Sequence, residues 1–281
     1  MKLRVEHRTR YDYAHPVKGS HNEARLQPSG SDGQVCHSFN LRVMPDTRVS
    51  HYHDFYNNTV HFFEVAEPHD FLLIESQSVV STPNLSLPPD LEVAPISALT
   101  QLARAEAFYD FLHTSSYVSM DPVVWRFALD ASFGCEDVWK TAQAVMRYIH
   151  TQFAYAPFST SVNTHMLEVL QQRSGVCQDF AHVMIGMCRT LKIPARYVSG
   201  YLYNEPAGDL AGSQASHAWC EVYLPGIGWR GLDPTNGRQA DERHVKIGVG
   251  RDYADIAPLK GHYRGTSAEK MKVEVSVAPA E

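Results

Sequence analysis

Apolar and polar side chains alternate in short runs along the first 95 residues, which is the pattern of half-buried β-strands. Turn-forming residues separate the runs, and Asn57-Asn58 between two of them is expected to form a hairpin turn. The runs lie at residues 3–5, 36–43, 60–66 and 71–80. Several short strands at this spacing predict an antiparallel β-sandwich-like domain.

The period of the apolar positions changes to that of α-helices after about residue 96. Four prolines between residues 82 and 95 indicate a linker at the change. Helices are expected over residues 97–113, 136–153, 164–172 and 177–191. We therefore predict an α+β protein with two domains, a β-rich N-terminal domain at 1–95 and an α+β core at 96–281.

The composition argues against several classes of function. A formal net charge of -6 without long runs of like charge argues against a nucleic-acid partner, since phosphate binding needs clustered Lys and Arg. No apolar run reaches the length of about 18 residues that spans a membrane, and the N-terminus lacks the apolar segment of a signal peptide, so a cytoplasmic location is expected. Five cysteines without a CxxC pair indicate neither a disulfide framework nor a zinc cluster. The sequence does not indicate an oligomeric state.

The helix predicted over 177–191 begins with a cysteine. Unpaired N–H groups and the helix dipole in a first turn stabilise a thiolate, and the same N–H groups can hold an oxyanion. On this helix alone two interpretations of Cys177 stay open, a nucleophile or a cysteine packed in the core. Cys188, three turns along on the same face, is expected to be a core residue.

The rest of this helix is predicted to be mostly buried, with Ser174 as its N-cap and Pro194 ending it. On a helical wheel the polar residues share one narrow sector, which is expected to be a wet stripe. They are Gln178, Asp179, His182, Arg189 and Thr190.

Two alternating segments around the turn Leu-Pro-Gly-Ile-Gly at 224–228 predict a β-hairpin. With this five-residue loop, Tyr223 opposes Trp229 and the register continues to Trp219 opposite Asp233. His217 is then the diagonal neighbour of Asp233 on the same face, at about 7–8 Å between Cα atoms, which is within side-chain reach. A slip of one residue would place the two side chains on opposite faces.

Cysteine, histidine and carboxylate together perform acyl transfer: the imidazole takes the thiol proton, the thiolate attacks a carbonyl, and the imidazole protonates the leaving amine. Taken singly, His217 is better interpreted as a hydrogen-bonded strand residue and Asp233 as a turn residue before Pro234. Taken with Cys177, at a helix start and on one hairpin, the catalytic interpretation is favoured.

At these residues the chain resembles the transglutaminase-like superfamily of papain-like cysteine enzymes. The segments that carry the resemblance are GVCQDFAHVMIGMCRTLKIPARYVSGY, SHAWCEVYLPGIGW and GLDPTNG, which hold Cys177, His217 and Asp233 in the order of that family. The segment RDYADIAPLKGHYRG and the β-rich half with its YDYAHPV motif resemble the bacterial branch. The resemblance implies a cysteine-bearing helix packed on an antiparallel sheet that carries the histidine and the aspartate.

The resemblance also implies attack of the cysteine on an amide to form a thioester. The oxyanion donor is expected to be the Cys177 N–H, and Tyr155 is the side-chain candidate, with a core tyrosine as its alternative interpretation. No acidic calcium loop is seen, and neither a metal nor a cofactor is expected.

Three functions follow as hypotheses. The first is a cysteine hydrolase, a protease or amidase that cleaves peptide, isopeptide or other amide bonds of a protein or peptide substrate. The second is protein cross-linking, as a protein-glutamine gamma-glutamyltransferase. The third is a non-catalytic binding module with a vestigial triad, against which the intact cysteine, histidine and aspartate argue.

Overall fold

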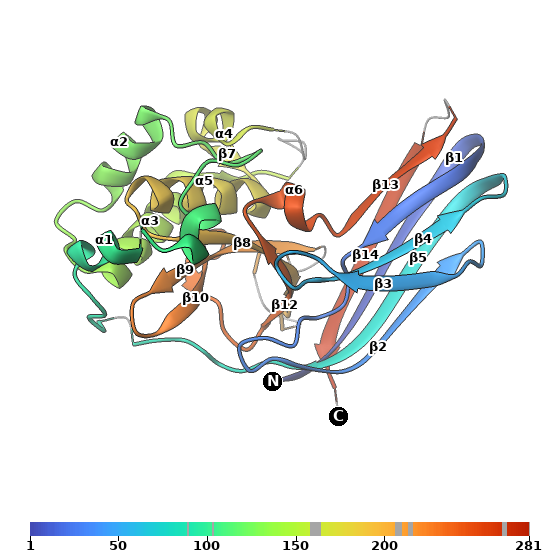
Figure 1. The fold of residues 1–281 in the computed structure, drawn as a ribbon, viewed down its shortest axis with the longest axis horizontal. Coiled ribbons are helices and arrows are strands. Elements are labelled where there is room, and N and C mark those ends of the chain that lie inside the picture. The colour runs from blue at the N-terminus through green and yellow to red at the C-terminus, as the bar shows by residue number, and fades with distance from the viewer. Residues whose placement is uncertain are drawn as a thin grey trace.

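A computed structural model describes residues 1–88, 90–102, 104–157, 164–205, 210–212, 216–265 and 269–280. The described chain forms a large curled antiparallel sheet and a second, smaller sheet with helices over it (Figure 1). Strands dominate and helices gather on one side, which confirms the predicted α+β class.

The first sheet has seven strands and centres on β1 (Lys2–Ala24). The path of the sheet runs β2 (Val35–Met44), β5 (His69–Ser81), β1, β4 (Thr59–Val65) and β3 (Val49–His53). β1 is shared along its length: residues 3–13 lie between β5 and β14 (Glu269–Pro279), and residues 18–24 lie between β4 and β13 (Leu259–Arg264). One long strand therefore joins two halves of a single curled sheet, where the sequence predicted a sandwich-like pair.

The four predicted strands all exist, within β1, β2, β4 and β5, but β1 is far longer than the alternation at 3–5 indicated. The predicted hairpin turn at Asn57-Asn58 lies between β3 and β4, and Asn57 takes the left-handed conformation there, with φ of 63°. β3 itself, which contains His51 and His53, was not predicted.

Two strands of the first sheet come from the C-terminal part of the chain. β13 and β14 return from the C-terminal part and pair with β1, with Leu3 opposite Pro279. The N- and C-terminal ends therefore lie side by side at one end of the first sheet (Figure 1).

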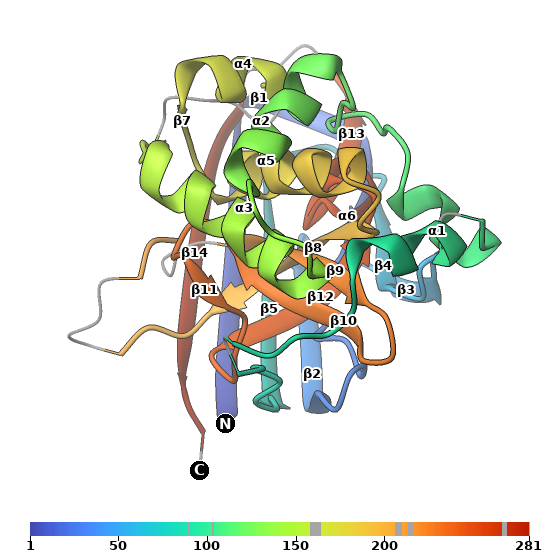
Figure 2. The same cartoon turned by 90° about the vertical axis from the view of Figure 1, so that its left-hand side faces the viewer.

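The second sheet has five strands in the order β11 (Arg238–Gln239), β10 (Gly228–Asp233), β9 (His217–Leu224), β8 (Ala195–Leu202) and β12 (His244–Gly250). Its helical cover consists of α2 (Pro122–Ala131), α3 (Val138–Gln152), α4 (Met166–Gln172) and α5 (Cys177–Thr190), with α6 (Tyr253–Ile256) beside β12 (Figure 2). α5 packs directly on β9 and β8.

Three of the four predicted helices form, as α3, α4 and α5. The helix predicted over 97–113 is wrong, because the segment breaks into η1 (Ile96–Ala98), α1 (Leu99–Leu102) and η2 (Glu106–Phe111). α2 was not predicted. At its start Asp121 caps the N–H of Val123 at 2.9 Å and Pro122 takes the first helical position.

α5 is more deeply buried than predicted. Asp179, His182 and Arg189 are at most 1% exposed, so the expected wet stripe is wrong. Arg189 instead donates to the carbonyl oxygens of Ala195, His113 and Arg251 at 2.7–3.1 Å, which satisfies a buried guanidinium without exposing it. Ser174 is also not the N-cap, because it lies in β7 (Ser174–Gly175).

The two sheets pack against each other through an apolar cluster. The first sheet contributes Leu3, Val5 and Val80, and β8, β12 and the residue after β8 contribute Tyr201, Val245, Ile247 and Tyr203. Beside it the Tyr201 hydroxyl and Nδ1 of His7 are hydrogen-bonded at 3.0 Å, and burial lowers the pKa of His7 to about 4. Asn58 bonds both the N–H and the carbonyl of Val249 at 2.8 Å. The curled sheet thereby holds the back of the sheet that carries the candidate site.

Among the described residues, helices fall short of the length and apolar character that crossing a bilayer requires.

Candidate active site

Cys177 is the first residue of α5, is half-buried and packs against the edge of the core. A side-chain hydrogen bond holds the first turn of α5: the Asp179 carboxylate accepts from the N–H of Val176 at 2.8 Å. A Cβ added to Gly175 would lie 2.7 Å from that carboxylate, so only glycine lets the carboxylate fold back under the helix start. The sequence therefore places Cys177 in the first turn of α5, at the positive end of the helix dipole.

The predicted hairpin and its register are confirmed. Trp229 lies opposite Tyr223, and the pairing continues to Leu232 opposite Cys220. His217 therefore begins β9 and Asp233 ends β10 at the same end of the second sheet.

His217 and Asp233 are joined by a hydrogen bond of 2.8 Å from Nε2 to Oδ2. Both side chains are fully buried. A carboxylate at this position holds the proton on Nε2. Nδ1 is buried and has no hydrogen-bond partner among the described residues.

Asp233 is held by several further donors. Its Oδ1 accepts from the backbone N–H groups of Thr235 at 3.0 Å and Asn236 at 3.2 Å. Its Oδ2 also accepts from the Asn236 side chain at 2.8 Å and lies 3.3 Å from Nε2 of His244. The turn after β10 is itself tied to α3, because Nδ1 of His150 lies 3.0 Å from the carbonyl oxygen of Thr235.

These contacts set the charges of the pair. Burial alone would lower the pKa of His217, but the charge and hydrogen bond of Asp233, with a contribution from the Cys177 thiol, raise it to about 10. Burial alone would raise the pKa of Asp233, but His217 and His244 hold it well below its usual range. An imidazolium beside a carboxylate is therefore the favoured state at neutral pH.

The chain at Ala211 and Gly212 lies next to Nδ1 of His217. A Cβ added to Gly212, whose φ is +83°, would lie 2.5 Å from Nδ1. The segment is anchored by Asn236, whose side chain accepts from Ala211 N at 3.0 Å and donates to Ala211 O at 3.3 Å. Asn236 thus links the chain over His217 to the carboxylate beneath it.

Tyr155 lies beside the site and not in the core. It ends β6 (Ala154–Tyr155), which pairs in parallel with β7, so that Tyr155 lies opposite Gly175, two residues before Cys177. Its side chain is 38% exposed. Burial, then the nearby Cys177 and Asp233, raise its pKa, so the hydroxyl stays protonated and able to donate.

One group of three described side chains brings metal-ligating atoms within 4.8 Å of one another: His217, Asp233 and His244. Both histidines already direct Nε2 at the same Asp233 oxygen, at 2.8 and 3.3 Å. The arrangement is therefore that of a hydrogen-bonded relay.

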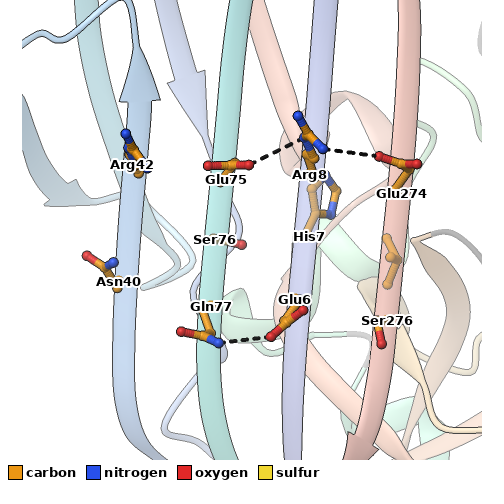
Figure 3. Close-up of a pocket in the computed structure, with 11 residues that line it drawn as sticks. Glu6, His7, Arg8, Asn40, Arg42, Glu75, Ser76, Gln77, Glu274 and Ser276 are labelled. Carbon is orange, nitrogen blue, oxygen red and sulfur yellow. Dashed lines mark hydrogen bonds and ion pairs between the residues drawn. The ribbon is translucent and has the colours of Figure 1, made fainter.

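One cavity lies away from the candidate site. A cavity of about 560 Å³ lies on the solvent face of the first sheet and is lined by charged pairs such as Arg8 with Glu75 at 3.3 Å and with Glu274 at 3.9 Å (Figure 3). These are cross-strand ion pairs between neighbouring strands and need no ligand to explain them.

Sequence reasoning missed His244 and Asn236. Asn236 follows Asp233 by three residues in the DPTNG turn, so the local turn chemistry was a usable signal. His244 reaches Asp233 only because β12 lies across the sheet on the far side of β8, and no local pattern indicates that.

The sequence matches two family models. The model of the transglutaminase-like superfamily core matches residues 127–234, which hold all three predicted catalytic residues. The model of the bacterial transglutaminase-like N-terminal region matches residues 3–81.

Relatives cover the whole chain. An uncharacterized protein of Mycobacterium leprae is 35% identical over 280 residues, 98% of each chain. An uncharacterized protein of Mycobacterium tuberculosis is 35% identical over 299 residues, covering 100% of this chain and 93% of its own. A protein-glutamine gamma-glutamyltransferase of Pseudomonas aeruginosa is 37% identical over 137 residues, 44% of this chain and 20% of its own.

The fold also has a solved counterpart. The crystal structure of a candidate cysteine protease from Cytophaga hutchinsonii aligns with a TM-score of 0.78 at 23% identity, covering 100% of this chain and 92% of that one. Family models, full-length relatives and the fold agree: the chain belongs to the transglutaminase-like superfamily and carries the bacterial transglutaminase-like N-terminal region.

Proposed function

We propose that the protein is a cysteine-dependent hydrolase of amide bonds in proteins or peptides, with Cys177 as nucleophile, His217 as general base and acid, and Asp233 as the residue that orients His217. The observation that carries the proposal is the buried 2.8 Å hydrogen bond between His217 and Asp233 beside a half-buried thiol at a helix start. A thiol alone, or a buried ion pair alone, would have a structural explanation.

The proposed reaction begins with the proton of the Cys177 thiol on the imidazole of His217. The thiolate attacks the amide carbonyl, and the resulting oxyanion is held by the Cys177 N–H and by the Tyr155 hydroxyl. The carbon–nitrogen bond breaks as His217 gives its proton to the leaving amine, which leaves a thioester on Cys177. Water then gives a proton to His217 and adds to the thioester, and the product acid leaves as the thiol re-forms.

Cross-linking is the second candidate, favoured by the partial match to a gamma-glutamyltransferase. It shares every step to the thioester and differs in the acceptor, since a primary amine replaces water. Hydrolysis is preferred because water needs no acceptor subsite of its own.

The test follows the fate of the acyl group. Casein and a peptide library are incubated with the protein in ¹⁸O-labelled water, with and without a fluorescent primary amine, and products are identified by mass spectrometry. The proposal expects ¹⁸O in new carboxyl groups and no product with Cys177→Ala. Amine adducts without labelled acid would establish cross-linking instead. A folded wild-type protein that gives neither product would favour the binding module.

A further inference from the structure

A second histidine shares the Asp233 carboxylate with His217. His244 begins β12, its side chain is 2% exposed, and its Nε2 lies 3.3 Å from Oδ2 of Asp233. The His217 Nε2 lies 2.8 Å from the same oxygen, and the two ring centroids are 6.3 Å apart. One carboxylate oxygen thus lies between two imidazoles that come from different strands.

The other nitrogen of His244 faces Asp241. Nδ1 lies 3.1 Å from the backbone N–H of Asp241 and 3.2 Å from its Oδ1. A neutral ring can accept from that N–H, and a protonated ring can donate to that oxygen, so both charge states are satisfied. In both states Nε2 carries a proton and donates to Asp233.

We propose that His244 is a positioning residue of the active site, which contacts the same Asp233 oxygen as His217 and thereby fixes the orientation of the carboxylate that holds the His217 ring. This inference rests on the proposed function, because orienting His217 matters only beside a reacting thiol. Trp219 packs edge-on against the His244 ring at 5.2 Å between centroids and supports the ring beside the carboxylate.

Charged groups around His244 come from three elements. Asp233 of β10 and Asp241 of the preceding turn attract its proton, while His217 of β9 repels it. Asp241 is itself paired with Arg238 at 3.1 Å and with Arg243.

On β12, Lys246 lies two residues further along, and its ammonium group pairs with Asp32 at 2.7 Å and with Glu221. Its charge is therefore held by other carboxylates. His217 and His244 compete for one carboxylate, so their titrations are coupled.

The experiment compares His244→Phe, which removes the donor, with His244→Gln, which keeps a donor but cannot titrate. The control is His69→Gln, since His69 is also buried and hydrogen-bonded, to Ser20 at 2.9 Å, but belongs to the first sheet. The ring nitrogens of His217 are followed by NMR on ¹⁵N-histidine-labelled protein across a pH titration, with His217→Asn supplying the assignment. Amide hydrolysis is measured in parallel.

In His244→Phe, Asp233 loses one of the donors that hold it and the charge that competes with His217 is removed. The His217 titration midpoint therefore rises by more than about half a pH unit, and kcat falls about tenfold to hundredfold because the carboxylate is held less firmly. His244→Gln and His69→Gln keep kcat within about threefold of wild type, as expected when the donor is kept or the site is untouched. A folded His244→Phe protein with wild-type His217 titration and kcat overturns the inference, as does His244→Gln impaired to the level of His244→Phe.

The two readouts separate the proposals. If neither the wild type nor any variant hydrolyses an amide, but the His217 titration shifts in His244→Phe, the proposed function is wrong and the coupling of His244 to His217 stands. An unshifted titration beside full wild-type hydrolysis would do the reverse.

Discussion

His217 and Asp233 lie at the free ends of the two strands of one hairpin and meet through a 2.8 Å hydrogen bond between Nε2 and Oδ2. The turn at 224–228 sets the register that puts them on the same face. Cys177 comes from a different part of the chain, at the start of α5, which packs on β9. The account of function depends on this meeting.

Replacing Asp233 with asparagine should remove catalysis without unfolding the protein. An amide keeps the size of the side chain but no longer raises the pKa of His217 or selects its tautomer. The expected loss in kcat is of order 10³–10⁴-fold, as for the aspartate of a serine protease triad. Steady-state hydrolysis gives the rate and circular dichroism checks the fold. A loss below tenfold would show that the carboxylate does not orient the base.

Stability should depend on pH through the same pair. The pKa of His217 is raised to about 10 from an ordinary value near 6.5, so the stability from its proton is complete below about pH 6.5 and is lost as pH rises to about 10. Asp233, with its pKa lowered, contributes in the opposite direction and loses its effect only in acid. Urea unfolding of wild type and His217→Asn should therefore differ most below about pH 6.5, as long as Asp233 stays ionised, and converge towards about pH 10.5. A difference that stays constant over this range would contradict the assigned protonation.

Gly212 should not accept a side chain. Alanine there meets both an unfavourable positive φ and the Nδ1 atom of His217 at 2.5 Å, so the imidazole or the segment must move. Gly226 is the matched control, because its φ is +77° and a Cβ there would meet nothing within 4 Å. Both alanine variants should lose about 1 kcal/mol of stability from the backbone, and only Gly212→Ala should lose hydrolysis, by more than about tenfold. Equal activity of the two variants would mean that the segment does not border the reacting nitrogen.

Arg189 should be needed for stability even though it lies far along α5 from Cys177. Arg189→Met would leave the carbonyl oxygens of Ala195, His113 and Arg251 without their donor in a buried site. A loss of about 3 kcal/mol or more in the free energy of unfolding is expected, whereas Arg126→Met on the surface should change it by less than about 0.5 kcal/mol. If Arg189→Met and Arg126→Met lose the same free energy of unfolding, Arg189 is solvent-exposed, as the helical wheel predicted.

Local patterns predicted the parts of the structure that local interactions determine. The register from Tyr223 and Trp229 followed from one turn, and α3 and α5 followed from apolar spacing. Both depend on residues close in sequence, where propensity and period are informative.

Long-range pairing was outside the reach of those patterns. The return of β13 and β14 to β1, and the approach of His244 to Asp233 across the sheet, join segments that carry no mutual signal in one sequence. The solvent-exposed stripe predicted for α5 was wrong for a related reason. A sequence does not distinguish a polar residue that is buried with hydrogen-bond partners from one that is exposed to solvent.

The most direct test of the central claim is the relative reactivity of the five cysteines. The protein is treated with limiting iodoacetamide at neutral pH, and each cysteine is quantified by mass spectrometry. Cys36 and Cys135 are the matched controls, because they are half-buried as Cys177 is. Cys177 should react at least about tenfold faster than either, because the proposed base His217 would take its proton. His217→Asn should abolish the advantage. Equal rates for Cys177, Cys36 and Cys135 in the folded wild-type protein would contradict the account.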